Sequence, residues 1–102
     1  MIQSFSDETT ADLFRARNTR AARRIPREFW RIVQRKLKLL DGAARLDDLA
    51  IPAGNRLERL ERLERLKGQR AERHSIRVND QYRVTFRWES GHAYEVGVAD
   101  YH

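Results

Sequence analysis

Residues 82–88 read YRVTFRW, and apolar and polar side chains alternate along the whole stretch. A period of two is typical of a β-strand that has one face on a hydrophobic core and the other in solvent. The apolar positions are Tyr82, Val84, Phe86 and Trp88, and the polar positions are Arg83, Thr85 and Arg87. The stretch therefore predicts a strand whose open face is basic.

The alternation continues on both sides of this strand. Apolar residues recur at every second position at Ile76 and Val78, and again at Tyr94, Val96 and Val98. The pairs Asn79-Asp80 and Ser90-Gly91, which separate these runs, are typical of tight turns. Three antiparallel strands are therefore expected from Ser75 almost to the carboxyl end, with Arg77 on the same open face as Arg83.

The first half of the chain has the periodicity of helices. One helix is expected from about Asp7 to Arg17, with acidic residues in its first turn. Arg15 and Arg17 would lie in its last turn, where the helix dipole favours cations, and Asn18 would end it.

A second helix is predicted from Pro26, which suits a first helical turn, to Gly42, which stops it. Its apolar residues recur at helical spacing at Phe29, Val33, Leu37 and Leu40. Leu46–Leu49 would add one further turn, and residues 51–55 have the composition of a loop.

A three-residue repeat, Leu-Glu-Arg, fills residues 57–65 and ends in Leu66-Lys67-Gly68. A period of three matches neither a helix nor a strand, so the leucines would drift around a helix or alternate between the faces of a strand. The helix propensities of Leu, Glu and Arg favour a short solvated helix with local Glu–Arg pairs, but the pattern assigns no structure firmly.

Together these patterns predict a single α+β domain over residues 1–102. Ile2–Phe5 would form a short N-terminal strand. This strand and two to three helices would pack on one face of an antiparallel sheet, whose other face would be basic.

The composition limits the class of protein. A chain of 102 residues, of which 40% are apolar and 35% charged, is typical of one folded domain rather than of a disordered tail or a membrane protein. The absence of cysteine excludes disulfide scaffolds, thiolate metal sites and cysteine nucleophiles. No stretch approaches the roughly 20 apolar residues of a spanning helix, and the first residues lack a secretion signal. A cytoplasmic protein without membrane contact is therefore expected.

The formal net charge of +6 is unevenly distributed. Residues 15–38 hold ten basic residues against the single acid Glu28, and a second basic stretch runs from Lys67 to Trp88. Of the 21 cations, 18 are arginines, whose planar fork matches phosphate. RNA or DNA is therefore the first partner to consider, and a merely solvated Arg-rich surface is the alternative.

Four stretches of the chain carry a more specific pattern. They read NRLE at residues 55–58, GQR at 68–70, HSIRVNDQYR at 74–83 and DYH at 100–102. With weaker similarity over residues 1–5 and the second helix, the chain resembles the HigB branch of the RelE superfamily of toxins. The resemblance implies a RelE-like fold and the toxin of a type II toxin–antitoxin pair. Such a toxin would be a ribosome-dependent endoribonuclease that cuts translated mRNA in the ribosomal A site.

The same resemblance implies the partners. The toxin would act on the 70S ribosome and its mRNA, and a HigA-type antitoxin with a helix-turn-helix domain would neutralise it. Operator DNA would be reached only through that antitoxin. No cofactor is implied, and the three histidines, at positions 74, 92 and 102, lack the spacing of a metal site.

RNA cleavage without a metal uses the adjacent 2′-hydroxyl as the nucleophile. A base must take its proton, an acid must protonate the leaving 5′-oxygen, and cations must stabilise the pentacoordinate phosphate. The resemblance assigns the cations to Lys67 and Arg83. Asp100, Tyr101 and His102 would supply acid–base groups and an aromatic ring that stacks on a base.

The repeat leaves the general base open. Some members of the family carry a histidine three residues before the active-site lysine, and Glu64 occupies that position here. Glu58 or Glu61 could equally supply the carboxylate, because the repeat makes the alignment ambiguous.

Two further groups of residues are expected to bind partners. RNA contacts are predicted for Arg70, His74, Arg77 and Arg87, although a histidine at the start of a strand often caps or packs instead. The antitoxin is expected to bind at Arg23, Arg24 and Arg27, where basic charge offers an electrostatic landing site.

A non-catalytic basic module that binds nucleic acid or protein is the alternative function. In that case Arg83 would be an ordinary solvated strand arginine, and the carboxyl end would be frayed.

Overall fold

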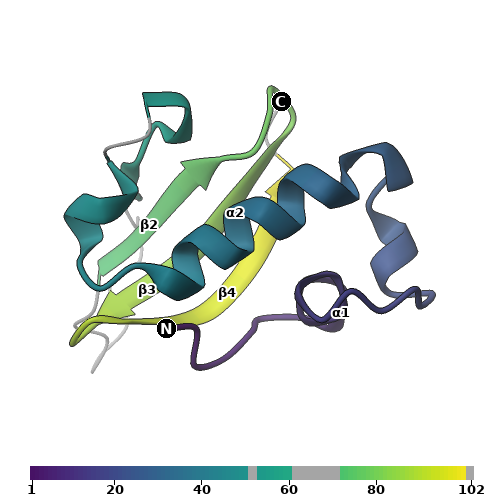
Figure 1. The fold of residues 1–102 in the computed structure, drawn as a ribbon, viewed down its shortest axis with the longest axis horizontal. Helices are drawn as coiled ribbons and strands as arrows, with labels where there is room; N and C mark the ends of the chain where they lie inside the picture. The colour runs from purple at the N-terminus through teal and green to yellow at the C-terminus, as the bar shows by residue number, and fades with distance from the viewer. Residues whose placement is uncertain (51–52, 61–71, 101–102) are drawn as a thin grey trace.

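The sheet has four antiparallel strands in the order β1-β2-β3-β4, of which β2, β3 and β4 are labelled in Figure 1. The strands are β1 (Glu58–Leu60), β2 (Glu72–Arg77), β3 (Tyr82–Glu89) and β4 (His92–Asp100). The computed structural model describes residues 1–50, 53–60 and 72–100. The predicted three-stranded meander is confirmed as β2 to β4, and β2 already begins at Glu72.

The helices lie on one face of this sheet, as Figure 1 shows for α2. The two α-helices are α1 (Glu8–Phe14) and α2 (Trp30–Gly42). Short 3₁₀ helices link the elements: η1 (Ala22–Arg24), η2 (Arg27–Phe29), η3 (Leu46–Leu49) and η4 (Ala53–Asn55). The predicted α+β class is confirmed, and so is the extra turn at Leu46–Leu49.

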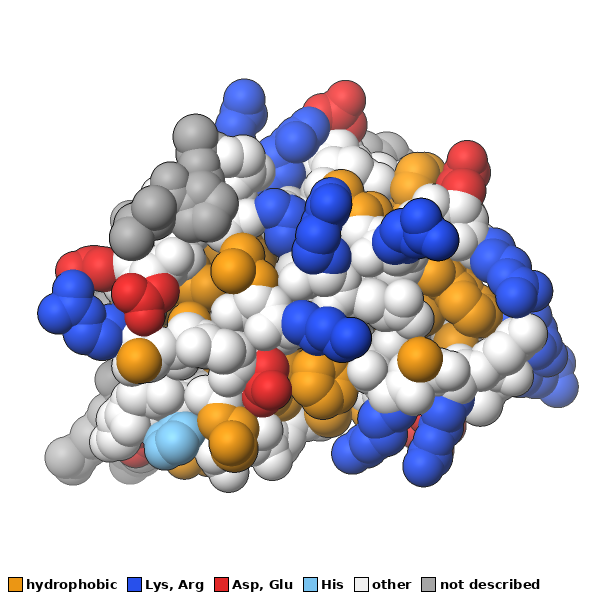
Figure 2. Space-filling view, in the orientation of Figure 1, with side chains coloured by type: hydrophobic (Ala, Val, Ile, Leu, Met, Phe, Trp, Pro, Cys, Tyr) orange, Lys and Arg blue, Asp and Glu red, His pale blue; other side chains and the backbone are white. Residues whose placement is uncertain are grey.

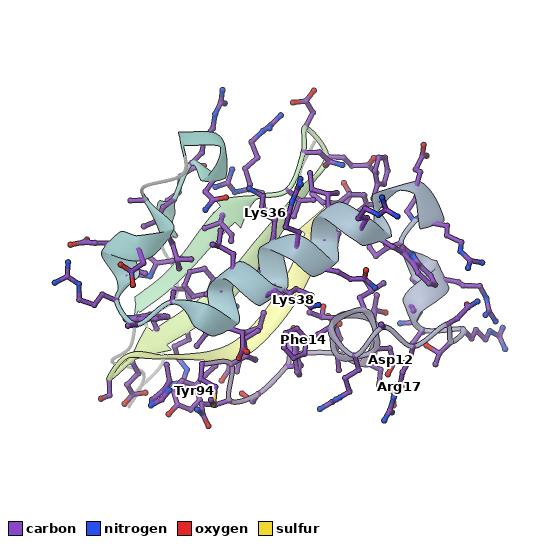
Figure 3. All side chains as sticks on the ribbon, viewed as in Figure 1. Asp12, Phe14, Arg17, Lys36, Lys38 and Tyr94 are labelled. Atoms are coloured by element: carbon purple, nitrogen blue, oxygen red, sulfur yellow. The ribbon has the colours of Figure 1, made fainter. Side chains whose placement is uncertain are left out.

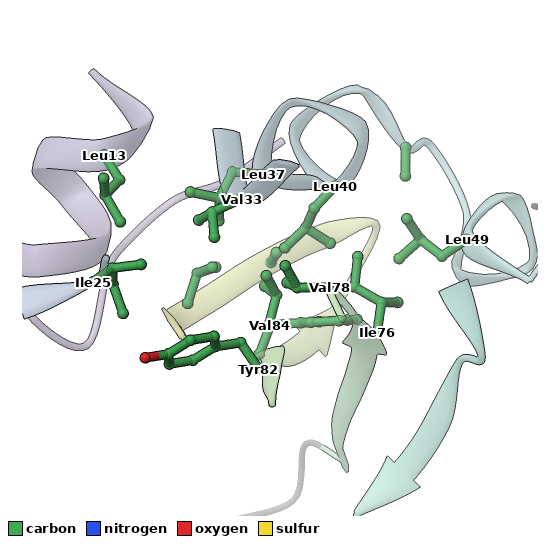
Figure 4. Packing of buried hydrophobic residues seen from close by; sticks show 14 of the residues in the cluster. Leu13, Ile25, Val33, Leu37, Leu40, Leu49, Ile76, Val78, Tyr82 and Val84 are labelled. Carbon is green, nitrogen blue, oxygen red and sulfur yellow. The ribbon is translucent and has the colours of Figure 1, made fainter. Parts of the chain in front are cut away.

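The core forms between α2 and the sheet (Figure 4). Val33, Leu37 and Leu40, at helical spacing on α2, are fully buried. They belong to the same hydrophobic cluster as Ile76, Val84 and Phe86 of the sheet. The two periodicities read from the sequence therefore meet in one apolar layer, which leaves the other face of the sheet for polar side chains.

Helix α1 is shorter than predicted. Asp7 caps its start by accepting a hydrogen bond from Thr10 N at 2.7 Å, but the helix ends at Phe14. Ala16 adopts a φ of 56°, and Arg17 N donates to Asp12 O at 2.8 Å. This left-handed cap closes the helix before Asn18, so the prediction that Arg15 and Arg17 lie in its last turn is wrong.

Helix α2 also starts later than the sequence indicated. Pro26 precedes η2, and the α-helical part begins at Trp30. Its end at Gly42 agrees with the prediction.

The N-terminal segment runs parallel to β4. Ile2 bridges to Ala93 and Phe5 bridges to Val96, while Ile2 N donates to Asp41 Oδ1 at 2.8 Å. These are two isolated bridges, so the expected N-terminal strand over Ile2–Phe5 is not continuous.

The favoured helix over the Leu-Glu-Arg repeat is wrong at Glu58–Leu60, which forms β1. Glu58 pairs with Ser75, and Leu60 pairs with Arg73. The open edge of β2 offers backbone hydrogen bonds that outweigh the helix propensity of these residues. The later units of the repeat, from residue 61, lie outside the described residues.

None of the helices in the described part of the chain is long and apolar enough to span a membrane.

Candidate functional site

The open face of the sheet carries two rows of polar side chains. Cross-strand pairs join Arg77 to Arg83, Ser75 to Thr85 and Arg73 to Arg87. Because paired residues share a face, these six side chains lie opposite the helices. The predicted placement of Arg77, Arg83 and Arg87 on the open face is confirmed.

Arg83 is held firmly although it lies on this open face. Only 9% of the residue is exposed. Its Nε donates to Ser75 Oγ at 2.8 Å, and its Nη2 donates to Arg56 O at 2.5 Å and to Ser75 O at 3.3 Å. These three hydrogen bonds hold the guanidinium in one orientation. A solvated arginine on a strand would not keep a single orientation.

Glu58 completes the environment of Arg83. Its Oε1 lies 3.0 Å from Arg83 Nη2, and 59% of its side chain is exposed. In the part of the chain that the structure describes, Arg83 Nη1 makes no hydrogen bond. The pair therefore offers a reactant an accessible carboxylate and a positioned guanidinium edge.

The carboxyl end of β4 approaches the same end of the sheet. Ala99 pairs with Arg83, and Asp100 pairs with Tyr82. Gln81 Nε2 donates to Asp100 Oδ2 at 3.3 Å. Burial raises the pKa of Tyr82, and the Asp100 carboxylate raises that pKa further. Asp100 therefore directly follows Ala99, the residue that pairs with Arg83. The Asp100 carboxylate, however, lies on the same face of the sheet as its own partner Tyr82.

Lys36 of α2 is a further cation whose charge interacts with that of Arg77, and the sequence pattern predicted no role for it (Figure 3). Its Nζ donates to the Oδ1 of the buried Asn55, whose Nδ2 donates to Leu49 O at 3.1 Å. Burial lowers the pKa of Lys36, and the charges of Arg35 and Arg77 lower it further. Because Lys36 reaches Asn55 only in the folded chain, the local pattern of α2 gave no sign of this contact.

His74 lies on the helix-covered face instead of the open face. It is buried, and its ring stacks on Phe86 with 6.0 Å between ring centroids. Its partner in the register is Phe86, whereas Ser75 next to it faces outward. This placement removes His74 from the surface that an RNA would touch, so it is not retained in the site.

Comparison with known proteins agrees with the fold. Residues 3–102 match the family model described as a RelE-like toxin of the type II toxin–antitoxin system HigB. The chain belongs to the HigB family of RelE-like toxins. It is also similar to Toxin HigB-1 of Vibrio cholerae serotype O1, with 48% identity over 69 residues. That match covers 68% of this chain. It covers 66% of the length of Toxin HigB-1, slightly less than two thirds.

Several of the residues predicted for a HigB-type site lie outside the described residues. They are Glu64, Lys67, Arg70, Tyr101 and His102. Their roles remain predictions from the resemblance.

The arginines predicted to bind a HigA-type antitoxin are exposed on the helical side. Arg23 Nη1 donates to Asn18 Oδ1 at 3.0 Å, and the Arg27 guanidinium lies 5.2 Å from the centre of the Trp30 ring. Figure 2 views the helical side and shows many Lys and Arg side chains spread over it. Among the described residues, no three His, Asp or Glu side chains gather as a metal site would require.

Proposed function

We propose that this chain is the toxin of a type II pair and cuts translated mRNA in the ribosomal A site. The observation that supports this proposal best is the contact between Arg83 and Glu58 on the open face. It joins a nearly buried guanidinium to an exposed carboxylate. Family membership supports the class of protein, and the pair supports the chemistry.

The pair provides two of the groups that metal-free RNA cleavage needs. Glu58 is one of the carboxylates that the sequence allows as the general base, and it would take the proton of the 2′-hydroxyl. The freed 2′-oxygen attacks the phosphorus, and the bond from phosphorus to the 5′-oxygen breaks. Arg83 would stabilise the negative charge on the equatorial oxygens through its Nη1 edge.

The leaving 5′-oxygen needs a proton. We assign the donation of this proton to His102. Tyr101 would stack on a base, and Lys67 would be a second cation. This assignment rests on the resemblance, and the pairing of Ala99 with Arg83 supports it because Tyr101 follows only two positions later in the chain. Asp100 would orient the tail through Gln81.

The partners follow from the same proposal. The toxin would act in the cytoplasm on the 70S ribosome and its mRNA. A HigA-type antitoxin would bind the exposed arginines of η1 and η2, and it alone would contact operator DNA.

Mapping of RNA ends on translating ribosomes tests the function. Wild-type protein is expected to produce new 5′ ends within A-site codons, and the chain without His102 is expected to fold and produce none. Arg83→Lys should also abolish cleavage, whereas Lys38→Gln on the exposed side of α2 should leave it unchanged. Binding to nucleic acid without any new RNA ends would favour the non-catalytic module.

A further inference from the structure

A β-bulge reshapes the open face at the end of the sheet away from Arg83. Arg87 pairs with Tyr94 and Thr85 pairs with Gly97, so two residues of β4 lie opposite Phe86 alone. One of them, Val96, is fully buried in the core. The other, Glu95, has a φ of 51°. The bulge thereby turns two consecutive side chains, Tyr94 and Glu95, toward the same open face.

The Glu95 carboxylate lies between two arginines. Its Oε2 is 3.3 Å from Arg73 Nη1, and its Oε1 is 3.7 Å from Arg87 Nε. Arg73 and Arg87 are direct cross-strand partners, so their like charges would repel without an anion between them. Glu95 supplies that anion.

Tyr94 adds an aromatic surface to the same place. The Arg87 guanidinium carbon lies 4.6 Å from the centre of the Tyr94 ring. Glu89 Oε2 holds Arg87 from its other edge, 2.5 Å from Nη1. Two guanidiniums and a phenol ring therefore have fixed relative positions on this face.

We infer that Arg73, Arg87 and Tyr94 form a second RNA subsite, for one phosphate and one base, and that Glu95 competes with this phosphate. A carboxylate and a phosphate fit the arginine fork in the same way. The base would stack on the ring of Tyr94. This inference rests on the proposed function, because it takes RNA to be the substrate.

The exposure of the three side chains shows that Glu95, and not Arg73 or Arg87, can move. Half of the Glu95 side chain is exposed, whereas Arg73 is 14% and Arg87 is 25% exposed. The carboxylate can therefore swing into solvent while both arginines stay in place.

The subsite takes a different nucleotide from the one that reacts. Arg83 and Arg87 are four residues apart on β3, which corresponds to about 13 Å. The two guanidiniums also point apart, because Arg83 contacts Glu58 of β1 and Arg87 contacts Glu95 of β4, so one phosphate does not bridge them. A phosphate bound by Arg87 would therefore set the register of the strand whose linkage lies at Arg83.

Binding of an uncleavable RNA tests the competition. The probe is a single-stranded oligoribonucleotide with methylated 2′-hydroxyls, and fluorescence anisotropy measures its dissociation constant. Glu95→Gln is expected to tighten binding about tenfold, since it removes the competing charge and keeps the shape of the side chain. The matched control is Glu28→Gln, which makes the same change of charge at an exposed position of η2 and should alter binding much less.

Double variants show whether the tighter RNA binding of Glu95→Gln depends on Arg73 and Arg87. Arg73→Gln and Arg87→Gln should each weaken binding and should abolish the gain from Glu95→Gln. Tyr94→Leu should weaken binding of the RNA but not of a matched chain that lacks bases. Equal effects of Glu95→Gln and Glu28→Gln would overturn the inference, as would a gain that persists without Arg73 and Arg87.

The two proposals fail in different ways. If Glu95→Gln tightens binding through the arginines but no RNA ends appear on ribosomes, the subsite stands and the nuclease falls. If ribosomal cleavage occurs while Glu95→Gln leaves RNA binding unchanged, the nuclease stands and the subsite is wrong.

Discussion

Arg83 of β3 reaches across β2 to contact Glu58 of β1, with 3.0 Å between Nη2 and Oε1. Ser75 lies beneath this contact and accepts a hydrogen bond from Arg83 Nε. The ion pair therefore joins the edge strand to the centre of the sheet and also places a carboxylate beside the candidate phosphate-binding cation. Its structural and its chemical roles have to be separated by experiment.

Ser75→Ala tests how Arg83 is positioned. Loss of the buried hydroxyl removes a hydrogen bond to a charged group, so the free energy of unfolding should fall by about 1.5–3 kcal/mol. Cleavage on ribosomes should fall while the affinity for ribosomes stays the same, because the guanidinium loses its orientation. Denaturant unfolding and the two ribosome assays measure these quantities, and a variant equal to wild type in all three would refute the positioning role.

The packing of α2 gives a second prediction. Leu37→Ala should lower the free energy of unfolding by about 2–5 kcal/mol, because Leu37 is fully buried in the core. Leu39 on the same helix is 36% exposed, and Leu39→Ala should change stability by only about 0.5 kcal/mol. Denaturant unfolding of the two variants checks the assignment of the faces of α2. Similar losses at both positions would contradict it.

Tyr82 makes the free energy of unfolding depend on pH in the alkaline range. Its pKa is raised above the ordinary value of 10.0, first by burial and then by Asp100. Above pH 10 the unfolded chain loses the phenol proton while the folded chain retains it, so stability is present below that pH and declines as the pH rises. Tyr82→Phe should show a smaller decline above pH 10 in denaturant unfolding. An unchanged decline would show that Tyr82 does not cause it.

The helical side offers a test of partner binding. Reversal of charge at Arg23, Arg24 and Arg27 to Glu should weaken binding of the antitoxin while leaving the fold intact, since these residues are exposed. Calorimetry with the purified antitoxin measures the affinity, and circular dichroism checks the fold. Unchanged affinity would place the antitoxin elsewhere.

Alternation of apolar and polar residues predicted the meander and the open face, but it was wrong at Tyr94, which was expected on the face of Val96 and Val98 and which the bulge places beside Arg87 on the open face. The same period of two also places His74 on the face of Ile76, so its burial was readable from the sequence although it was expected to bind RNA. The Leu-Glu-Arg repeat hid β1, because its period favours neither regular structure and only the edge of β2 decides the outcome.

The partners of the arginines could not be predicted in the same way. Glu58 meets Arg83 across an intervening strand, and Glu95 reaches Arg73 only because a bulge turns it outward. Both contacts join residues that are far apart in the sequence, and no local pattern encodes them. The sequence therefore predicts a more basic face than the structure shows.

The rate of mRNA cleavage on programmed ribosomes by Glu58→Gln tests the central claim most directly, namely that Arg83 and Glu58 form the catalytic centre. Glutamine keeps the shape and a hydrogen-bond acceptor for Arg83 but cannot take a proton, so the rate should fall about 100-fold or more. Glu28→Gln makes the same change of charge at an exposed position of η2, away from the open face, and should cleave within a few-fold of wild type. Cleavage by Glu58→Gln at the wild-type rate would contradict the account, and loss of activity in Glu64→Gln instead would assign the base to Glu64.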